Sequence, residues 1–342
     1  MKLQTPVTDA PCKVGISYDD RILFLGSCFA ENIGSRLRDY GFDVLVNPFG
    51  TLYNPMSVLS CVRRLVSGEH FSEDDCVMMG AGAGLICSFS HHTSFARSTS
   101  EVFLENANKA LDQASDFFRS CNKVVITLGT AWCFRHIEKG FIVSNCLKRP
   151  ASEFSRERLT PDQVTVCLQE IAALCTASSS EESPAPCTTS RLPKQKELIF
   201  TVSPIRHLAD GAHGNQLSKS TLLLGIDALL NPGTQPGLLS GGDPGLLSGE
   251  HPGLLSGGAP GVPLGTSPSA PSCMDYFPSY EIVMDELRDY RFYAEDMCHP
   301  TKQTEDYILE RFLDWALPVS EHSILNQKIR AFKQSRHITT PR

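Results

Sequence analysis

The stretch Ile22-Leu23-Phe24-Leu25-Gly26-Ser27-Cys28-Phe29-Ala30 decides how the chain is expected to fold. Four apolar residues before a glycine are typical of a parallel strand covered on both faces, and residues 31–39 have the pattern of a helix. This arrangement would place Ser27 at the carboxyl end of the strand, beside a helix N-terminus, where open α/β sheets bind ligands. Ser27 then has two interpretations: a catalytic nucleophile, or a turn residue that caps the helix.

The composition disfavours several classes of protein. The chain has 342 residues and a formal net charge of −7 without a basic stripe, so no nucleic-acid partner is predicted. No apolar run is long enough to span a membrane and no leader pattern opens the chain, so the expected location is cytoplasmic. Thirteen cysteines without a Cys-x-x-Cys pair predict neither a disulfide scaffold nor a zinc site, and no metal or cofactor is expected.

Apolar runs and helical patterns alternate along most of the chain. The alternation predicts an α/β fold, a three-layer α/β/α sandwich whose central sheet is mainly parallel and has about five strands. A hairpin is expected at residues 132–136 and 141–143. The strands expected in the central sheet are residues 22–25, 44–46, 124–128, 198–202 and 275–283. Helices are expected at about residues 31–39, 55–66, 101–119, 160–175, 216–230 and 301–317.

The chain is expected to form a single domain over residues 1–342, with a core at about 15–318 and a C-terminal tail at 319–342. Residues 176–196, rich in Ser, Pro, Glu and Lys, predict a flexible loop. The octad Pro236-Gly237-Leu238-Leu239-Ser240-Gly241-Gly242-Asp243 is echoed from Pro244 and from Pro252. Residues 231–272 are therefore predicted to be a disordered insertion, because so much Pro and Gly cannot bury enough apolar surface to offset the ordering entropy.

A second group of candidate residues follows the last expected strand. Asp296-x-x-His299 is the pair that a serine nucleophile requires, because the carboxylate holds one imidazole nitrogen and leaves the other to accept the hydroxyl proton. This short pattern is common by chance, but Ser, Asp, His is an order that catalytic triads adopt along the chain. Adjacent histidines in an extended chain face opposite ways, so one of the pair, His92, is expected in a pocket and His91 in solvent.

The chain resembles the GSCFA-domain proteins, whose name is the string Gly26 to Ala30, and these look like members of the SGNH (GDSL-like) hydrolase superfamily. The resemblance covers nearly the whole ordered chain and includes residues 47–51, 126–132, 203–207 and 285–300. It implies a flavodoxin-like parallel sheet. It also implies that Ser27 is the nucleophile, His299 the general base and Asp296 the carboxylate that orients the base.

The resemblance further implies an oxyanion hole, a set of N–H donors that stabilise the developing negative charge. The backbone N–H groups of Ser27 and Gly50 are two expected donors, although a glycine in that loop is also explained by a turn. The third donor in typical members is an asparagine, and this chain has Ala131 at that position. Asn145 is the expected substitute and Thr130 the second candidate, with an ordinary polar loop residue as the alternative for both.

Three further residues, Arg206, His207 and His92, are candidates for binding a polar or anionic substrate group. Arg206 has an alternative, an ion pair with the acidic residues at 285–289. The predicted function is a serine esterase that removes an acetyl or other O-acyl group from a carbohydrate or similar hydroxylated substrate. The alternatives are acyl transfer at the same site, and a module that binds a glycan or metabolite without turnover. The expected partner is a small-molecule or carbohydrate ester.

Overall fold

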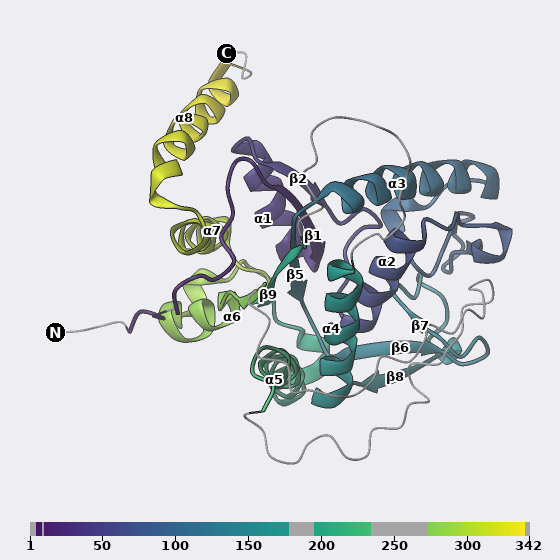
Figure 1. Cartoon of the computed structure of the whole chain (residues 1–342). Coiled ribbons are helices and arrows are strands. Elements are labelled where there is room, and N and C mark those ends of the chain that lie inside the picture. The colour runs from purple at the N-terminus through teal and green to yellow at the C-terminus, as the bar shows by residue number, and fades with distance from the viewer. Residues whose placement is uncertain (1–4, 9, 178–194, 234–272, 339–342) are drawn as a thin grey trace.

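The computed structural model describes residues 5–8, 10–177, 195–233 and 273–338. Its central sheet has five parallel strands in the order β10-β9-β5-β1-β2 (Figure 1). This is the flavodoxin-like order, in which the first strand of the chain lies second from one edge. The predicted α/β fold with a parallel sheet is confirmed. The strands are β1 (Arg21–Gly26), β2 (Asp43–Val46), β5 (Lys123–Leu128), β9 (Glu197–Val202) and β10 (Met274–Tyr276).

Alternate residues of β1 face two different hydrophobic cores. Leu23 and Leu25 belong to one buried cluster, whereas Ile22 and Phe24 belong to the other. All four side chains are essentially inaccessible to solvent. A strand covered on both faces needs apolar residues at every position, which explains the continuous run in the sequence.

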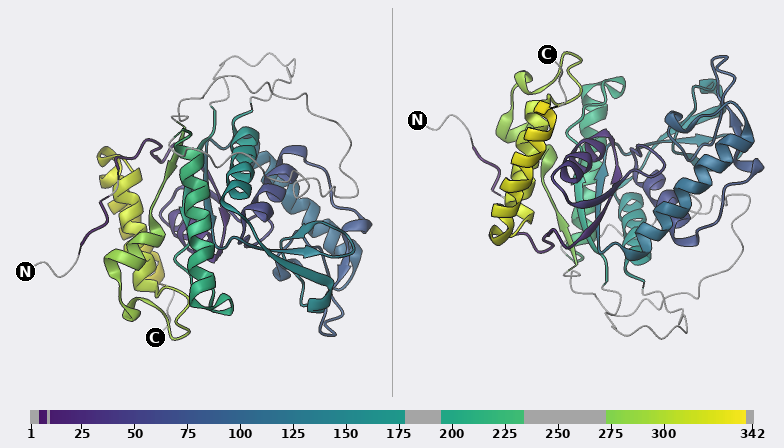
Figure 2. Two further views of the ribbon diagram at one scale, coloured as in Figure 1. Left: turned by 90° about the horizontal axis from the view of Figure 1, so that it is seen from below. Right: turned by 90° about the horizontal axis from the view of Figure 1, so that it is seen from above.

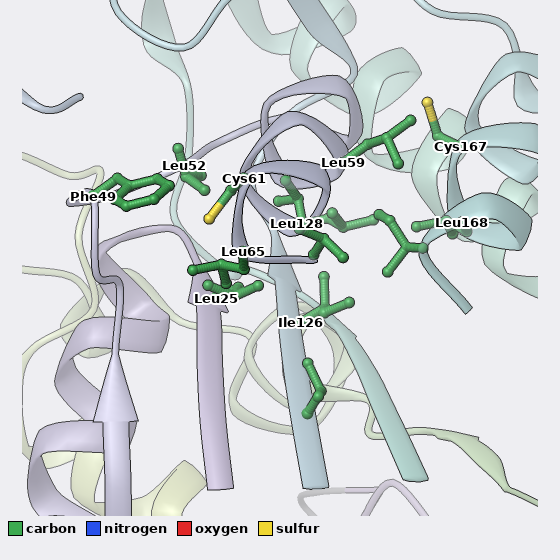
Figure 3. Packing of buried hydrophobic residues seen from close by; sticks show 14 of the residues in the cluster. Leu25, Phe49, Leu52, Leu59, Cys61, Leu65, Ile126, Leu128, Cys167 and Leu168 are labelled. Atoms are coloured by element: carbon green, nitrogen blue, oxygen red, sulfur yellow. The ribbon is translucent and has the colours of Figure 1, made fainter. Parts of the chain in front are cut away.

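Helices cover both faces of the sheet and complete the three layers. α2 to α5 contribute side chains to the larger cluster, and α1 and α7 contribute to the other, on the opposite face (Figure 2). Figure 3 shows part of the larger cluster, where Leu59 and Leu65 of α2 pack with Leu25 and Ile126 of the sheet. The helices are α1 (Cys28–Asp39), α2 (Pro55–Ser67), α3 (Ser100–Ser120), α4 (Pro161–Thr176), α5 (Gly211–Leu230) and α7 (Lys302–Ala316).

A three-stranded antiparallel sheet follows β5 and therefore begins at the carboxyl edge of the central sheet. β6 (Trp132–His136) pairs with β7 (Ile142–Val143), which confirms the predicted hairpin. Its other neighbour, β8 (Phe154–Arg158), was not predicted, because four of its five residues are polar or charged. Two short strands, β3 (Val77–Met78) and β4 (Ile86–Cys87), form a separate antiparallel pair.

The fifth central strand is shorter than predicted. It ends at Tyr276, and the residues beyond form α6 (Ser279–Glu281) and a π-helical segment (Ile282–Leu287). Pro278 has no N–H to donate to a strand ladder, so a strand that includes it is disfavoured. The expected strand over residues 275–283 was therefore wrong in its second half, where the apolar residues are buried on a helix instead.

The C-terminal segment that was expected as a tail contains a long helix, α8 (His322–Ile338), which packs Leu325 into the second cluster. Most of the expected flexible loop at 176–196 and of the expected insertion at 231–272 lies outside the described residues. Over the part of the chain that the structure describes, no helix combines the length and the apolar character needed to cross a bilayer.

Candidate active site

Ser27 lies in the turn between β1 and α1. The strand ends at Gly26 and the helix begins at Cys28, a little earlier than the sequence pattern indicated. Ser27 is 1% exposed, and its Oγ accepts a hydrogen bond from the backbone N–H of Phe29 at 3.3 Å. Ser27 is therefore the N-cap of α1, on the carboxyl edge of the sheet.

The close approach of two backbones requires a glycine at position 26. Gly26 has φ +138°, and a Cβ built on it would lie 2.1 Å from the carbonyl oxygen of Thr127 in β5. The N–H of Ser27 donates to the same oxygen at 3.2 Å. The turn that carries Ser27 is thus held directly against the neighbouring strand, with no room for a side chain between them.

Asn47 fastens this turn to the end of β2. Its Oδ1 accepts a hydrogen bond from the N–H of Gly26 at 2.8 Å, and its Nδ2 donates to Oε2 of Glu31 at 3.1 Å. The residue has φ +42°, a left-handed conformation that asparagine adopts more readily than most residues. Sequence reasoning did not single it out, although an Asn directly after a strand and before Pro48 is a typical turn signal.

Asp296 and His299 form the expected pair in the loop before α7. His299 Nδ1 lies 2.6 Å from Asp296 Oδ2, while Asp296 Oδ1 accepts hydrogen bonds from the N–H groups of Cys298 at 2.9 Å and His299 at 3.0 Å. The hydrogen bonds from these backbone N–H groups, with that of the His299 ring, lower the pKa of Asp296 to about 2. An ionised carboxylate only accepts hydrogen bonds, so Nδ1 carries the proton and Nε2 is left as the basic nitrogen.

A cavity of about 590 Å³ lies at the carboxyl ends of β1, β5 and β9. It brings together residues far apart in the chain, at the edge where open α/β sheets bind ligands. Among the predicted site residues, those that line it are Ser27, Thr130, Asn145, Arg206, His207 and His299. Gly50 and His92 do not line it, and Asp296 is connected to it through His299.

The two expected backbone donors of the oxyanion hole are both engaged within the protein. The N–H of Ser27 donates to Thr127, and the N–H of Gly50 donates to the carbonyl oxygen of Asn47 at 2.8 Å. Gly50 has φ +85°, and a Cβ there would lie 2.2 Å from Cβ of His92. A glycine at position 50 is therefore explained by a tight turn packed against His92.

The side chain of Asn145 has a free donor in the cavity. Its Oδ1 accepts a hydrogen bond from the N–H of Leu147 at 2.8 Å, and no described residue accepts from its Nδ2. The hydroxyl of Thr130 instead pairs with that of Ser218 at 3.0 Å and accepts from the N–H of Trp132 at 3.1 Å. Of the two candidate substitutes for the missing asparagine, Asn145 is the one with an unused N–H.

The expectation for the adjacent histidines was wrong for His91. That residue is fully buried rather than solvated, with its ring against aromatic side chains and its Nδ1 2.6 Å from Ser88 Oγ. Burial lowers the pKa of His91 to about 3, so the ring is neutral. His92 caps a short 3-10 turn by accepting from the N–H of Ser94, away from the cavity lining.

The antiparallel sheet forms an aromatic wall of the cavity. Trp132 and Phe134 are two residues apart in β6 and therefore lie on the same face of this sheet. The guanidinium carbon of Arg156 in β8 lies 4.2 Å from the Trp132 ring centroid. Arg156 also forms an ion pair with Asp210, which follows β9 in the chain. Sequence reasoning missed this wall, because it depends on the unpredicted strand β8.

The comparisons with known proteins define a family. A model of the GSCFA family matches residues 21–235 and 267–312, well over half of the chain. This chain belongs to the GSCFA family. The match is interrupted at residues 236–266, where the octad repeat lies. No curated protein and no solved structure gives a significant match. Among the described residues of this GSCFA protein, no cluster of three or more His, Cys, Asp or Glu side chains could hold a metal ion.

A buried lysine joins two strand ends beneath the cavity of this GSCFA protein. Lys219 of α5 is 1% exposed, and its Nζ donates to the carbonyl oxygens of Gly129 at 2.6 Å and Ser203 at 2.7 Å. Burial lowers the pKa of Lys219 to about 7. Its neutral form has two N–H donors, which match the two acceptors. No sequence pattern marked this lysine, because its partners are distant backbone groups.

His207 shares the cavity with His299 but has a different environment. Burial, with a smaller contribution from the charge of Lys219, lowers the pKa of His207 to about 4. Its backbone N–H donates to Asn215 Oδ1 at 3.0 Å, which connects the loop after β9 to α5. His207 is therefore a neutral imidazole near neutral pH, whereas the ring of His299 is 52% exposed and paired with a carboxylate.

Replacing Gly26 by alanine is expected to lower the free energy of unfolding by about 3 kcal/mol or more, because the new methyl group would clash with the Thr127 carbonyl. Gly68→Ala is the matched control. Gly68 also has a positive φ but nothing within 4 Å of a built Cβ, so about 1 kcal/mol is expected there. Urea titration of both variants measures the difference. Equal losses would show that the turn has room for a side chain.

Replacing Lys219 by methionine is expected to remove one source of pH dependence in stability. Between pH 7 and 10.5 the unfolded lysine binds more protons than the folded one, so its contribution to the stability of the wild type increases as the pH rises through this range. The difference in unfolding free energy between wild type and Lys219→Met should therefore move in favour of the wild type from pH 7 to pH 9. A difference that stays constant would mean that folding leaves the pKa of Lys219 unchanged.

Proposed function

We propose that this GSCFA protein is an SGNH-type serine hydrolase, an O-acyl esterase that removes an acetyl group from a carbohydrate or similar hydroxylated substrate. The main support is that Ser27 and His299 line one cavity on the carboxyl edge of a flavodoxin-like sheet, and that His299 is hydrogen-bonded to Asp296. A nucleophile, a base and a carboxylate that orients the base are the parts that acyl transfer requires.

In the proposed mechanism, Nε2 of His299 takes the hydroxyl proton of Ser27 while Oγ bonds to the acyl carbon of the ester. The resulting tetrahedral intermediate collapses by breaking the bond to the alcohol oxygen, which receives the proton from His299. A water molecule then attacks the acyl-enzyme and gives its proton to the same nitrogen. Release of the acid returns the proton to Ser27, and Asp296 holds the ring in position throughout.

The proposal requires a rearrangement at Ser27 and His299. Ser27 Oγ accepts from Phe29 N–H, and its proton is available because an acceptor role leaves the O–H unused. Ser27 and His299 are both among the described residues, and no hydrogen bond joins their side chains. Hydrogen bonds between catalytic groups are often long without substrate and shorten in the complex, and the His299 side chain is half exposed.

Asn145 is the proposed side-chain donor of the oxyanion hole. Its Nδ2 is unpaired among the described residues, and the residue lines the same cavity as Ser27. The backbone N–H groups of Ser27 and Gly50 would have to exchange their present acceptors for the oxyanion. Asn145 is therefore the donor that needs the least reorganisation.

A second candidate function is a binding module that uses the same cavity without turnover. The observation that favours it is the burial of Ser27, which is 1% exposed and whose N–H donates to the carbonyl oxygen of Thr127. Acyl transfer to a sugar hydroxyl is a third possibility on the esterase chemistry, since an alcohol in place of water would resolve the same acyl-enzyme.

Ser27→Ala and His299→Ala are each expected to reduce hydrolysis of 4-nitrophenyl acetate and of acetylated xylose about 10³-fold or more, because each removes a group that acts in the transition state. Initial rates with the purified variants measure the loss. A fluorophosphonate probe should label the wild type at Ser27 and leave Ser27→Ala unlabelled.

His70→Ala is the matched control for this experiment, since that exposed histidine also pairs with a carboxylate, Asp112, but lies outside the cavity lining. It is expected to retain full activity. Hydrolysis that survives in both Ser27→Ala and His299→Ala would exclude the triad. Saturable glycan binding by a protein that hydrolyses no ester would support the binding module instead.

Asn145→Ala is expected to lower kcat about 10²- to 10³-fold with little change in KM, because an oxyanion donor acts mainly in the transition state. Asn326→Ala, at an exposed position on α8, is the control and should change neither constant. Steady-state kinetics on an acetyl ester separates the two effects. If Thr130→Val lowers kcat and Asn145→Ala does not, the donor is Thr130.

A further inference from the structure

Arg206 lies between the main cavity and a second one. It follows β9, and its side chain lines both the 590 Å³ cavity that holds Ser27 and a neighbouring cavity of about 280 Å³. Tyr290 and Tyr293 line the second cavity, which His299 and Ser27 do not reach. The shared guanidinium makes Arg206 the point where one ligand could extend from the first cavity into the second.

The guanidinium of Arg206 has no acidic partner among the described residues. Its Nη1 donates to the carbonyl oxygen of Met297 at 3.2 Å, and its central carbon lies 5.8 and 5.7 Å from the ring centroids of Tyr290 and Tyr293. A guanidinium carries five N–H donors, so most of them remain available to a ligand. The ion pair with residues 285–289 that was the alternative for Arg206 is not formed.

The other charged groups that line the second cavity or the wall of the main one are already paired. Asp289 binds Arg291 at 2.7 Å, and Arg288 lies 3.7 Å from Asp285. On the other side of the main cavity, Arg156 pairs with Asp210. Arg206, which lines both cavities, is therefore a cation without an oppositely charged partner among the described residues.

We propose that Arg206 and Tyr290 form an anion-binding subsite for a carboxylate or phosphate group of the substrate. This inference rests on the proposed function for the position of the ester, which would lie at Ser27 while the anionic group occupies the second cavity. A planar guanidinium matches a carboxylate or phosphate with two parallel hydrogen bonds. Tyr290 is 66% exposed and offers an apolar ring beside that charge. The substrate class is an acylated sugar acid or sugar phosphate.

The fixed position of Arg206 supports a role in substrate placement. Its backbone N–H donates to the carbonyl oxygen of Cys298 at 3.0 Å, the residue next to His299. The backbone that carries the anion-binding side chain is thus tied to the loop that carries the proposed general base. A substrate bound through its charge would place its ester in a constant position relative to His299.

The test measures binding by calorimetry for glucuronate, glucose 6-phosphate and neutral glucose. The wild type is expected to bind at least one anionic sugar about tenfold or more tightly than glucose, as expected for one hydrogen-bonded charge pair. Arg206→Gln should bind all three with similar affinity, and Arg206→Lys should keep part of the preference. Arg119→Gln, which removes an equal charge from α3, is the control and should match the wild type.

Tyr290→Ala tests the position of the subsite, because Tyr290 lines the second cavity and does not line the main one. It should weaken binding of the preferred anionic sugar, and an unchanged affinity would contradict a subsite in that cavity. Equal affinities for charged and neutral sugars in the wild type, or a preference that survives in Arg206→Gln, would overturn the proposal. Calorimetry needs no turnover. A preference for anionic sugars in a protein that hydrolyses no ester would therefore refute the esterase and still support the anion-binding subsite. The preferred anion identifies carboxylate or phosphate as the ligand.

Discussion

The contact between the backbone of Gly26 and the carbonyl group of Thr127 is the constraint on which the rest of the cavity depends. Because β1 and β5 approach without a side chain between them, the turn that carries Ser27 at the carboxyl edge lies directly against the end of β5. Asn47 holds the same turn from the other side, through the N–H of Gly26. The turn that carries Ser27 is thus held from both sides, by the end of β5 and by Asn47 after β2, and the loops that bear Arg206 and His299 lie around the same cavity.

Much of the central fold could be predicted from the sequence, because strands buried on both faces leave an unmistakable apolar run. The strands β1, β5 and β9 were recognised in this way. The pattern of β8 was weaker, because that strand has a single apolar residue. The apolar residues after Pro278 were predicted as a strand, although they lie buried in a π-helical segment. A short apolar run alone does not distinguish the two conformations.

The candidate site was predictable to the extent that its contacts are local. Asp296 and His299 are three residues apart, so their pairing follows from the sequence spacing and is present in the structure. Lys219 was missed because its acceptors are backbone oxygens on two distant strands, which no side-chain pattern encodes. His91 was misjudged for a related reason, since its burial depends on aromatic residues from several separate segments.

The amino edge of the sheet has a consequence for how such a chain can change over generations. The chain between α4 and β9 ends at Glu197, where β9 begins, and the chain between α5 and β10 ends at Met274, where β10 begins. The cavity occupies the opposite edge. Repeat units gained or lost between α5 and β10 would therefore lengthen or shorten the chain at attachment points on the edge of the sheet opposite to Ser27.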